Sequence, residues 1–174
     1  MIQKYSRYTI LQEFFDSPTK SFHMREISRN TKITQPSASI HLKALLHEKL
    51  ILKEDKGLYP TYRANRDYEL FKIYKKLNIL LRIQQANLLD YISNACSPRA
   101  IILFGSASLG EDIETSDLDL FIRSEKAELS LEKYEKILKR KINPFFEEKF
   151  NRLSNELKNN ILNGIILKGY IKVY

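Results

Sequence analysis

Residues 101–123 read IILFGSASLGEDIETSDLDLFIR, and this stretch decides the fold of the second half of the chain. The apolar run 100–104 is rich in β-branched and aromatic residues and ends at Gly105, which predicts a buried strand. Residues 116–122 alternate between polar and apolar, which predicts a second strand. Asp117 and Asp119 are two residues apart, so a strand would project both carboxylates to the same side.

The residue types in this stretch favour binding of a metal and a phosphate. Two neighbouring carboxylates repel each other, and their burial is costly without a counter-ion. Mg²⁺ supplies that compensation and prefers carboxylate oxygen ligands. Gly105 allows a ligand to approach the backbone closely, and Ser106 offers a hydroxyl and N–H groups at a possible helix start.

This arrangement resembles the minimal nucleotidyltransferases of the DNA polymerase β-like superfamily. The resemblance rests on a strand, Gly105-Ser106, ten intervening residues and Asp117-Leu118-Asp119, and is close over residues 98–123 and loose to residue 174. It implies that Gly105 and Ser106 bind the phosphates of a nucleoside triphosphate. It also implies that Asp117 and Asp119 are the catalytic residues and ligate Mg²⁺ for in-line displacement of pyrophosphate by a hydroxyl. The alternative is an acidic loop beside a solvated strand edge.

One part of that family's pattern is missing. The family places a third carboxylate on a later strand, but the next strand-like run, residues 141–146, contains no acid. Asn143 occupies the expected position, and an amide cannot accept a proton at neutral pH. Glu147 and Glu148 follow, although they fit better in the first turn of a helix. Nucleotide and metal binding are therefore compatible with slow or absent turnover.

Positive charge is concentrated near the N-terminus. The chain has 174 residues and a net charge of +8. Residues 1–66 carry +6, residues 67–100 carry +2 and residues 101–174 are neutral. This asymmetry indicates a polyanionic partner for the first third of the chain.

Cysteine usage and hydropathy bear on localisation. Cys96 is the single cysteine, so no disulfide forms within the chain, as is usual in a reducing compartment. No apolar run reaches membrane length, and the N-terminus lacks the pattern of a signal peptide. We expect a cytoplasmic protein with no membrane partner.

Residues 5–66 have the pattern of three helices followed by a hairpin. Apolar positions at helical spacing predict helices around residues 8–15, 23–30 and 35–48, with Pro36 in the first turn of the third. Ile51 and Leu52 begin a strand, residues 55–57 form a turn, and a second strand returns over residues 59–64.

This segment resembles the winged helix-turn-helix repressors of bacteria and archaea. The resemblance rests on residues 24–28, 33–37 and 41–45, followed by 48–51 before the wing. It implies binding of double-stranded DNA, with small polar residues of the third helix in the major groove. The expected groove residues are Gln35, Ser37, Ser39 and His41, and the expected phosphate contacts are Lys32, Lys43, Lys53, Lys56 and Arg63. The alternative is a protein-docking module.

Residues 67–94 predict one long helix without Gly or Pro. Its apolar stripe consists of Leu70, Tyr74, Leu77, Leu81, Leu88 and Ile92. An exposed linker would not keep such a stripe in water, so the helix either packs on both domains or pairs with a second copy. Because winged helices usually bind DNA as dimers, we expect a homodimer with this helix at the interface.

Taken together, these patterns predict an α+β protein with three parts. They are a winged helix-turn-helix domain at 1–66, a linker and dimerisation helix at 67–96, and a nucleotidyltransferase-like domain at 97–174. Further helices are predicted at 130–140 and 147–163, with another apolar segment at 165–167 and a last strand or tail at 169–174. We expect a small mixed sheet with helices on one face.

Two functions remain open at this level. The first is a DNA-binding enzyme that binds Mg²⁺ and a nucleoside triphosphate and transfers a nucleoside monophosphate to an acceptor hydroxyl. The acceptor would be a protein, as for the antitoxins of this superfamily that modify a partner toxin, or a small molecule or a nucleic-acid end. The second is a transcription regulator in which the nucleotidyltransferase fold is an inactive sensor or dimer scaffold. Asn143 and the basic first third favour regulation, whereas the Gly-Ser and Asp-Leu-Asp motifs favour chemistry.

Overall fold

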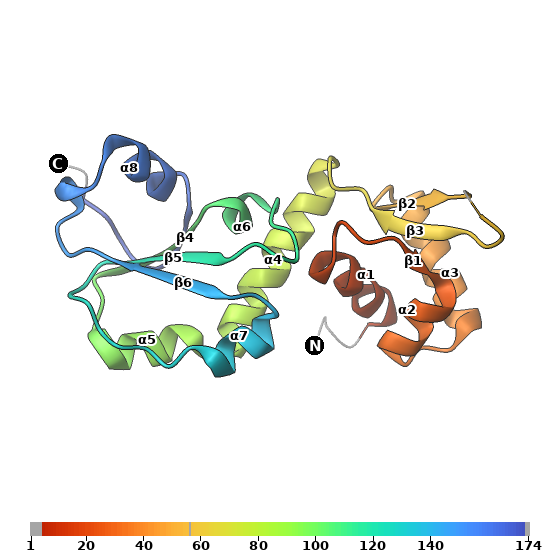
Figure 1. The fold of residues 1–174 in the computed structure, drawn as a ribbon, viewed down its shortest axis with the longest axis horizontal. Helices are drawn as coiled ribbons and strands as arrows, with labels where there is room; N and C mark the ends of the chain where they lie inside the picture. The colour runs from red at the N-terminus through yellow and green to blue at the C-terminus, as the bar shows by residue number, and fades with distance from the viewer. Residues whose placement is uncertain (1–4, 56, 173–174) are drawn as a thin grey trace. The chain divides into compact units, whose positions relative to one another are not determined.

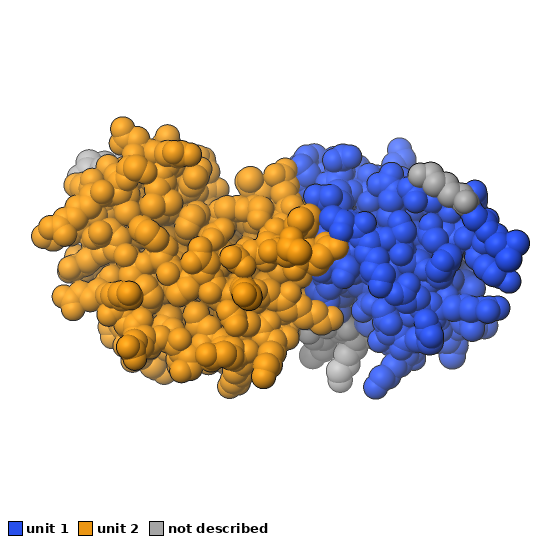
Figure 2. All heavy atoms as spheres, viewed as in Figure 1, with its two compact units in different colours: residues 1–75 blue, residues 76–174 orange. Residues whose placement is uncertain are grey.

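A computed structural model describes residues 5–55 and 57–172. The chain divides into two compact units, residues 1–75 and 76–174, shown in blue and orange in Figure 2. The division falls inside helix α4, Glu69–Gln85. Each unit is therefore described by itself.

Unit 1 contains three helices and a small antiparallel sheet (Figure 1). The helices are α1 (Ser6–Asp16), α2 (Met24–Thr31) and α3 (Gln35–His47), and the strands are β1 (Phe22–His23), β2 (Ile51–Glu54) and β3 (Thr61–Ala64). The three helices and the hairpin follow each other in the predicted order. Strand β1 was not predicted, because its two residues form a strand only by pairing with Thr61 and Tyr62 of β3.

The core of unit 1 is formed by the apolar faces that the helical spacing predicts. Helix α1 buries Ile10, Leu11, Phe14 and Phe15, and α3 buries Ala38, Leu42 and Leu45. The ring of Phe14 also meets that of Phe22 edge-on at 5.4 Å between centroids. Burial of each large side chain of this kind contributes about 1.5–3 kcal/mol.

Unit 2 is built on a mixed four-stranded sheet in the order β6-β5-β4-β7. The strands are β4 (Ala100–Phe104), β5 (Leu118–Ile122), β6 (Ile142–Phe146) and β7 (Ile165–Gly169). The helices are α5 (Leu88–Cys96), α6 (Ser106–Leu109), α7 (Glu132–Leu138), the 3₁₀ helix η2 (Phe150–Arg152) and α8 (Asn155–Leu162). Strand β5 is antiparallel to β4 and parallel to β6, which confirms the predicted mixed sheet.

Both faces of this sheet are covered, so the prediction of helices on one face was wrong. Ile101 and Leu103 pack in a cluster with residues of α5 and α7, whereas Ile102 packs in a second cluster with η2 and α8. Figure 1 shows α8 and the pair α5 and α7 on opposite sides of the strands. The reason is visible in the sequence, since the unbroken apolar run 100–104 is typical of a strand buried on both faces.

The predicted single helix over 67–94 is interrupted, and this prediction was also wrong. Helix α4 ends at Gln85, and α5 begins after Asn87, whose φ of 56° is left-handed. Asparagine is one of the few residues that adopts this conformation readily. The predicted apolar stripe is not the buried face of α4 either, because Leu77 and Leu81 of the stripe are 50% and 37% exposed whereas Ile83, outside the stripe, is buried.

The helix predicted over 147–163 is likewise divided. The 3₁₀ helix η2 is followed by Leu153 in an extended conformation, and α8 begins after Ser154. The side chain of Ser154 accepts a hydrogen bond from the N–H of Leu157, which is the usual N-cap interaction. The last strand lies at 165–169, where it includes the apolar segment predicted at 165–167 and pairs with β4 from Leu103 back to Ala100. Residues 170–172 lie outside any strand, so of the two alternatives for 169–174, a strand or a tail, the strand is not found at 170–172.

A search of the described part of the chain for membrane spans found no helix with the length and hydrophobicity needed to cross a bilayer.

Candidate functional site

The pairing of β4 with β5 brings Gly105 against Asp119. Phe104 lies opposite Asp119 in the antiparallel register, so the residue after β4 meets the start of β5. Gly105 has φ 70° and ψ −160°, a backbone region that is almost exclusive to glycine. A Cβ atom at this position would lie 2.6 Å from Oδ2 of Asp119. The absence of a side chain at Gly105 therefore leaves room beside this carboxylate oxygen.

The other oxygen of Asp119 is bound by Asn143. The parallel register of β5 and β6 places these two residues opposite each other, and Asn143 Nδ2 donates to Asp119 Oδ1 over 2.9 Å. The structure thus places Asn143 where the missing third carboxylate was expected. Glu147 does not replace it, because its N–H donates to the carbonyl of Ile122 at the opposite end of β5.

Asp117 is exposed and immediately precedes β5, at the end of the acidic loop 111–117. A turn shapes the end of this loop: the N–H of Ile113 donates to Ser116 Oγ, and that of Ser116 donates back to the carbonyl of Ile113. Farther back, Asp112 forms a buried ion pair with Arg140, with Nη2 and Nε both 3.2 Å from Oδ2.

The Asp112–Arg140 pair was not predicted from sequence. Their side chains are only 9% and 5% exposed, and the pair connects the acidic loop to the residues just before β6. It therefore fixes the loop that carries Asp117 to the strand that carries Asn143. No sequence signal identifies the pair, because its two residues are 28 positions apart and belong to no local motif.

Ser106 begins the short helix α6 directly after Gly105. The turn is held by Ser108, whose Oγ donates to the carbonyl of Gly105 over 2.7 Å, and by Glu111, whose N–H donates to the carbonyl of Ser106. Ser106 is half-buried. Because Phe104 lies opposite Asp119, the Gly-Ser dipeptide after β4 and the two aspartates at the start of β5 lie at the same edge of the sheet. We call this group, Gly105, Ser106, Asp117, Asp119 and Asn143, the motif edge.

The donor atoms of the motif edge fit a hard divalent cation. Within the described residues no cluster of three or more His, Cys, Asp or Glu side chains is arranged to hold a metal. Mg²⁺ does not require one, since it is commonly held by one or two carboxylates, water and substrate phosphates. Asp117 and Asp119 are two carboxylates at this edge, and the missing Cβ at Gly105 leaves space beside Oδ2 of Asp119.

In unit 1, the predicted DNA-binding residues fall into three groups. Gln35, Ser39 and Lys43 recur at every fourth position of α3 and form its outer face, with Gln35 and Lys43 exposed and Ser39 half-buried. Ser37 is half-buried at the side of this face, and Lys32 is exposed in the turn before α3. The remaining candidates are His41 and the three cations predicted in the β2–β3 hairpin, Lys53, Lys56 and Arg63.

Two cations of the β2–β3 hairpin are partly neutralised by neighbouring acids. Arg63 Nε lies 2.7 Å from Glu54 Oε1, and Lys53 Nζ lies 2.9 Å from Asp55 Oδ1. The hydrogen bond that Lys53 donates to Asp55, together with the negative charge of Asp55, raises the pKa of Lys53 above its usual value. Lys56 lies outside the described residues.

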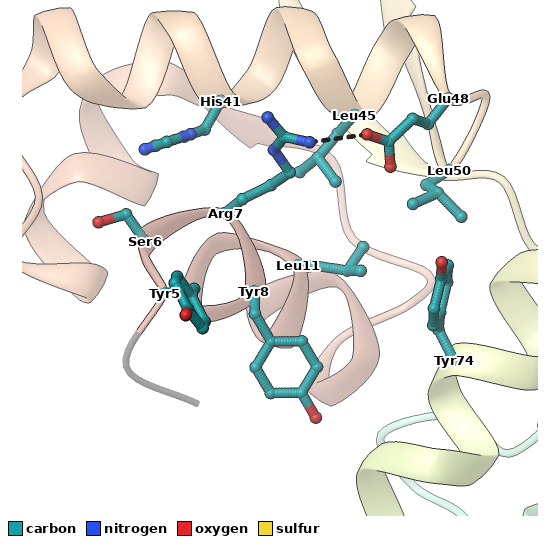
Figure 3. Close-up of a pocket in the computed structure, with 10 residues that line it drawn as sticks. All are labelled: Tyr5, Ser6, Arg7, Tyr8, Leu11, His41, Leu45, Glu48, Leu50 and Tyr74. Atoms are coloured by element: carbon teal, nitrogen blue, oxygen red, sulfur yellow. Dashed lines mark hydrogen bonds and ion pairs between the residues drawn. The ribbon is translucent and has the colours of Figure 1, made fainter. Parts of the chain in front are cut away.

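His41 does not lie on the outer face of α3 with Gln35. It lines a cavity of about 490 Å³ against α1, together with Tyr5, Ser6, Arg7, Tyr8, Leu11, Leu45, Glu48, Leu50 and Tyr74 (Figure 3). Its Nδ1 atom is buried and has no hydrogen-bond partner in the described part of the chain. The cause is its helical position, one turn from the buried Leu45. This placement favours packing against α1 over contact with DNA.

Sequence reasoning missed several residues near the start of α3. Arg25 and Arg29 of α2 line a cavity of about 480 Å³ with Gln35 and Tyr59, and the Arg25 guanidinium lies 5.8 Å from the centre of the Tyr59 ring. Ile40, on the outer face of α3, is 65% exposed. The charge of the two arginines was visible in the sequence, but their proximity to Gln35 depends on the packing of α2 against the β2–β3 hairpin.

Comparison with known families assigns unit 2. Residues 87–167 match the family model described as nucleotidyltransferase domain. The match begins at the break between α4 and α5, before residue 97 where the domain was expected to start, and includes the complete motif edge. No curated protein and no solved structure matches the chain. The second unit of this protein therefore contains a nucleotidyltransferase domain.

Proposed function

We propose that this protein binds DNA through unit 1 and a nucleoside triphosphate with Mg²⁺ through unit 2, and that it transfers a nucleoside monophosphate to an acceptor hydroxyl. The observation that carries the proposal is the contact of Gly105 with Asp119. The Gly-Ser dipeptide and the Asp-Leu-Asp motif are separated in sequence, and strand pairing brings them to one edge.

Each residue of the motif edge has a distinct role in this proposal. The backbone at Gly105 and the hydroxyl of Ser106 hold phosphate oxygens, and Gly105 admits them because no Cβ blocks the approach. Asp117 and Asp119 ligate Mg²⁺. When bound, the ion would neutralise the phosphates and stabilise the charge that develops on the leaving pyrophosphate. Asn143 orients Asp119 through its amide hydrogen bond.

The same hydrogen bond supports a second candidate function. Asn143 occupies the position of the third carboxylate, and its amide cannot remove a proton from an attacking hydroxyl. A domain without that base is suited to bind nucleotide and turn over slowly or not at all. In this case the protein is a transcription regulator whose nucleotidyltransferase domain is a sensor or scaffold.

The proposal for DNA binding rests on charge and on the outer face of α3. Residues 1–66 carry +6, and Gln35 and Lys43 are both exposed on α3. Gln35 would contact a base edge, while Lys32 and Lys43 would contact phosphates, in the manner of a winged helix-turn-helix. Ile40 adds an exposed apolar side chain that suits a thymine methyl group.

We further propose a homodimer with α4 at its interface. Leu77 and Leu81 are four residues apart, hence on one side of this helix, and are 50% and 37% exposed. The Leu77→Ser/Leu81→Ser variant is expected to be monomeric at concentrations where the wild type is dimeric, as measured by light scattering after gel filtration. A wild type that is monomeric at all concentrations would remove this part of the proposal.

Calorimetric titration tests the nucleotide site. ATP, GTP, CTP and UTP, each with Mg²⁺, are titrated into the wild type and into Asp119→Asn, with the exposed Asp90→Asn on α5 as the charge-matched control. We expect metal-dependent binding of at least one nucleotide. Asp119→Asn should weaken this binding tenfold or more, about 1.4 kcal/mol, and the control should leave it unchanged.

The outcome separates the two candidate functions. Binding that depends on Asp119, followed by transfer of the labelled nucleotide to an acceptor, supports the enzyme. Binding without transfer supports the sensor. If no nucleotide binds to the folded wild type, neither role of unit 2 as a nucleotide-binding domain survives.

A further inference from the structure

A group of cationic and aromatic side chains lies at the edge of the sheet opposite the motif edge. Arg99 directly precedes β4, Arg123 directly follows β5, and Tyr170 and Lys172 follow β7. The backbone ladder holds these positions together: the N–H of Arg99 donates to the carbonyl of Arg123, and the N–H of Arg123 donates to that of Ala100. The cationic residues next to the ends of β4, β5 and β7 therefore lie close together.

Close backbone packing completes this edge. Gly169 pairs with Ala100 and has φ +71°. A Cβ atom on Gly169 would lie 2.0 Å from the carbonyl oxygen of Arg99, so only glycine allows β7 to approach here. This approach positions the next residue, Tyr170, beside the two arginines.

The side chains enclose a cavity of about 410 Å³ that is lined by Arg99, Arg123, Tyr170 and Lys172. Glu148 also approaches the two arginines: its Oε1 is 3.9 Å from Arg99 Nη2, and its backbone carbonyl accepts a bond from Arg123 Nε over 3.1 Å. One carboxylate against three cations leaves a positive excess. The Arg99 side chain is 70% exposed, so the long contact with Glu148 contributes little and is easily replaced.

We propose that this cavity binds a nucleotide unit, with its phosphate held by Arg99, Arg123 and Lys172 and its base stacked on Tyr170. The guanidinium group of arginine and the ammonium group of lysine bind phosphate more strongly than other side-chain groups do. Tyr170 is 63% exposed, and an aromatic ring beside a cationic groove is the usual way to bind bases of a single strand.

This site is separate from the motif edge. Asp119 lies opposite Phe104 at one end of β4, whereas Arg123 bonds to Ala100 at the other. Four residues of strand separate them, about 13 Å along the sheet. The two edges also differ in charge, because residues 111–119 contain five acids and no base. A phosphate without a metal therefore favours the edge of the sheet that carries Arg99 and Arg123.

Fluorescence anisotropy of the full-length protein tests the site independently of the proposed transferase. The probe is a fluorescein-labelled single-stranded hexanucleotide, and EDTA excludes metal-dependent binding at the motif edge. The variants are Arg99→Gln/Lys172→Gln and Tyr170→Leu. Lys133→Gln/Lys136→Gln on α7 is the charge-matched control, since both lysines are exposed and lie on another element.

The double variant should weaken binding at least tenfold and reduce the salt slope by about 1.4, or 0.7 for each lost cation. Tyr170→Leu should weaken it at least fivefold with no change in salt slope, because stacking of one base is worth about 1–3 kcal/mol. Cross-linking of a 4-thiouridine hexamer, followed by peptide mapping, should label the peptide that contains Tyr170. Equal binding by the site variants and the control, or labelling confined to unit 1, would overturn the proposal.

Competition with AMP identifies the source of the nucleotide unit. If AMP displaces the probe and shows the same sensitivity to Tyr170→Leu, the cavity takes free nucleotides. If AMP fails to displace a probe that remains sensitive to both site variants, the cavity takes single-stranded nucleic acid. Both outcomes support a nucleotide-binding cavity at Arg99, Arg123, Tyr170 and Lys172.

Discussion

The motif edge of unit 2 and the outer face of α3 in unit 1 are both candidate binding surfaces, but they are built differently. At the motif edge, strand register places Gly105 beside Asp119 and sets Asn143 opposite Asp119, where a hydrogen bond joins the two side chains. On α3, Gln35, Ser39 and Lys43 share a face of the helix that is partly exposed to solvent, and strand register does not hold them together. A substitution at the first surface should therefore have a large effect, and a substitution at the second a small one.

The largest effect is expected for Gly105→Ala. The new methyl group would lie 2.6 Å from Asp119 Oδ2 and would force a side chain into a glycine-only backbone conformation, which costs about 1–3 kcal/mol. We expect Mg²⁺-dependent nucleotide binding to fall below detection in calorimetry. Gly57→Ala is the control, because nothing lies within 4 Å of its Cβ position. Retained nucleotide affinity in Gly105→Ala would separate the Gly-Ser turn from the site.

The motif edge was largely predictable from sequence for a physical reason. Buried strands leave a strong pattern, and strand alternation singled out Asn143 before its hydrogen bond to Asp119 was known. Asp117 lies one residue before β5, although the predicted strand of residues 116–122 included it. The Asp112–Arg140 pair was not predictable, because its partners meet only after the acidic loop and α7 are packed. The two corrections in the helices have the same origin: Asn87 between α4 and α5, and Ser154 between η2 and α8, precede new helices without any Gly or Pro to mark the break.

Arg140→Met tests whether this buried pair supports the motif edge. The substitution removes the Arg140 guanidinium from the buried Asp112 carboxylate, and breaking a buried ion pair in this way typically costs about 3–5 kcal/mol. We expect a loss of about 3 kcal/mol in urea-induced unfolding of unit 2. The double variant Asp112→Asn/Arg140→Met should recover most of that loss. If the double variant is as unstable as the single one, the effect arises from packing of Arg140 and not from the ion pair.

Asn143→Asp sharpens the comparison in the opposite direction, since it should add activity. The register places residue 143 beside Asp119, so the new carboxylate would join the metal-binding pair and supply the missing base. We expect labelled-nucleotide transfer at least tenfold faster than in the wild type, with tighter Mg²⁺ binding. Asn160→Asp on the exposed side of α8 is the control for added charge. Transfer that stays equally slow in both variants would favour the inactive sensor.

The smallest effect is expected for Lys43→Gln on the outer face of α3. This lysine is exposed and is one of several cations in a unit where residues 1–66 carry +6, so its loss should weaken duplex binding only about two- to fourfold. The salt slope of binding should fall by about 0.9, because one phosphate contact is lost. Lys20→Gln is the control, since Lys20 lies outside α3 and already pairs with Glu26. Measured by anisotropy with a labelled duplex, an unchanged slope would show that α3 does not face the phosphates. A change of a hundredfold would show instead that this surface, like the motif edge, depends on single residues held in a fixed arrangement.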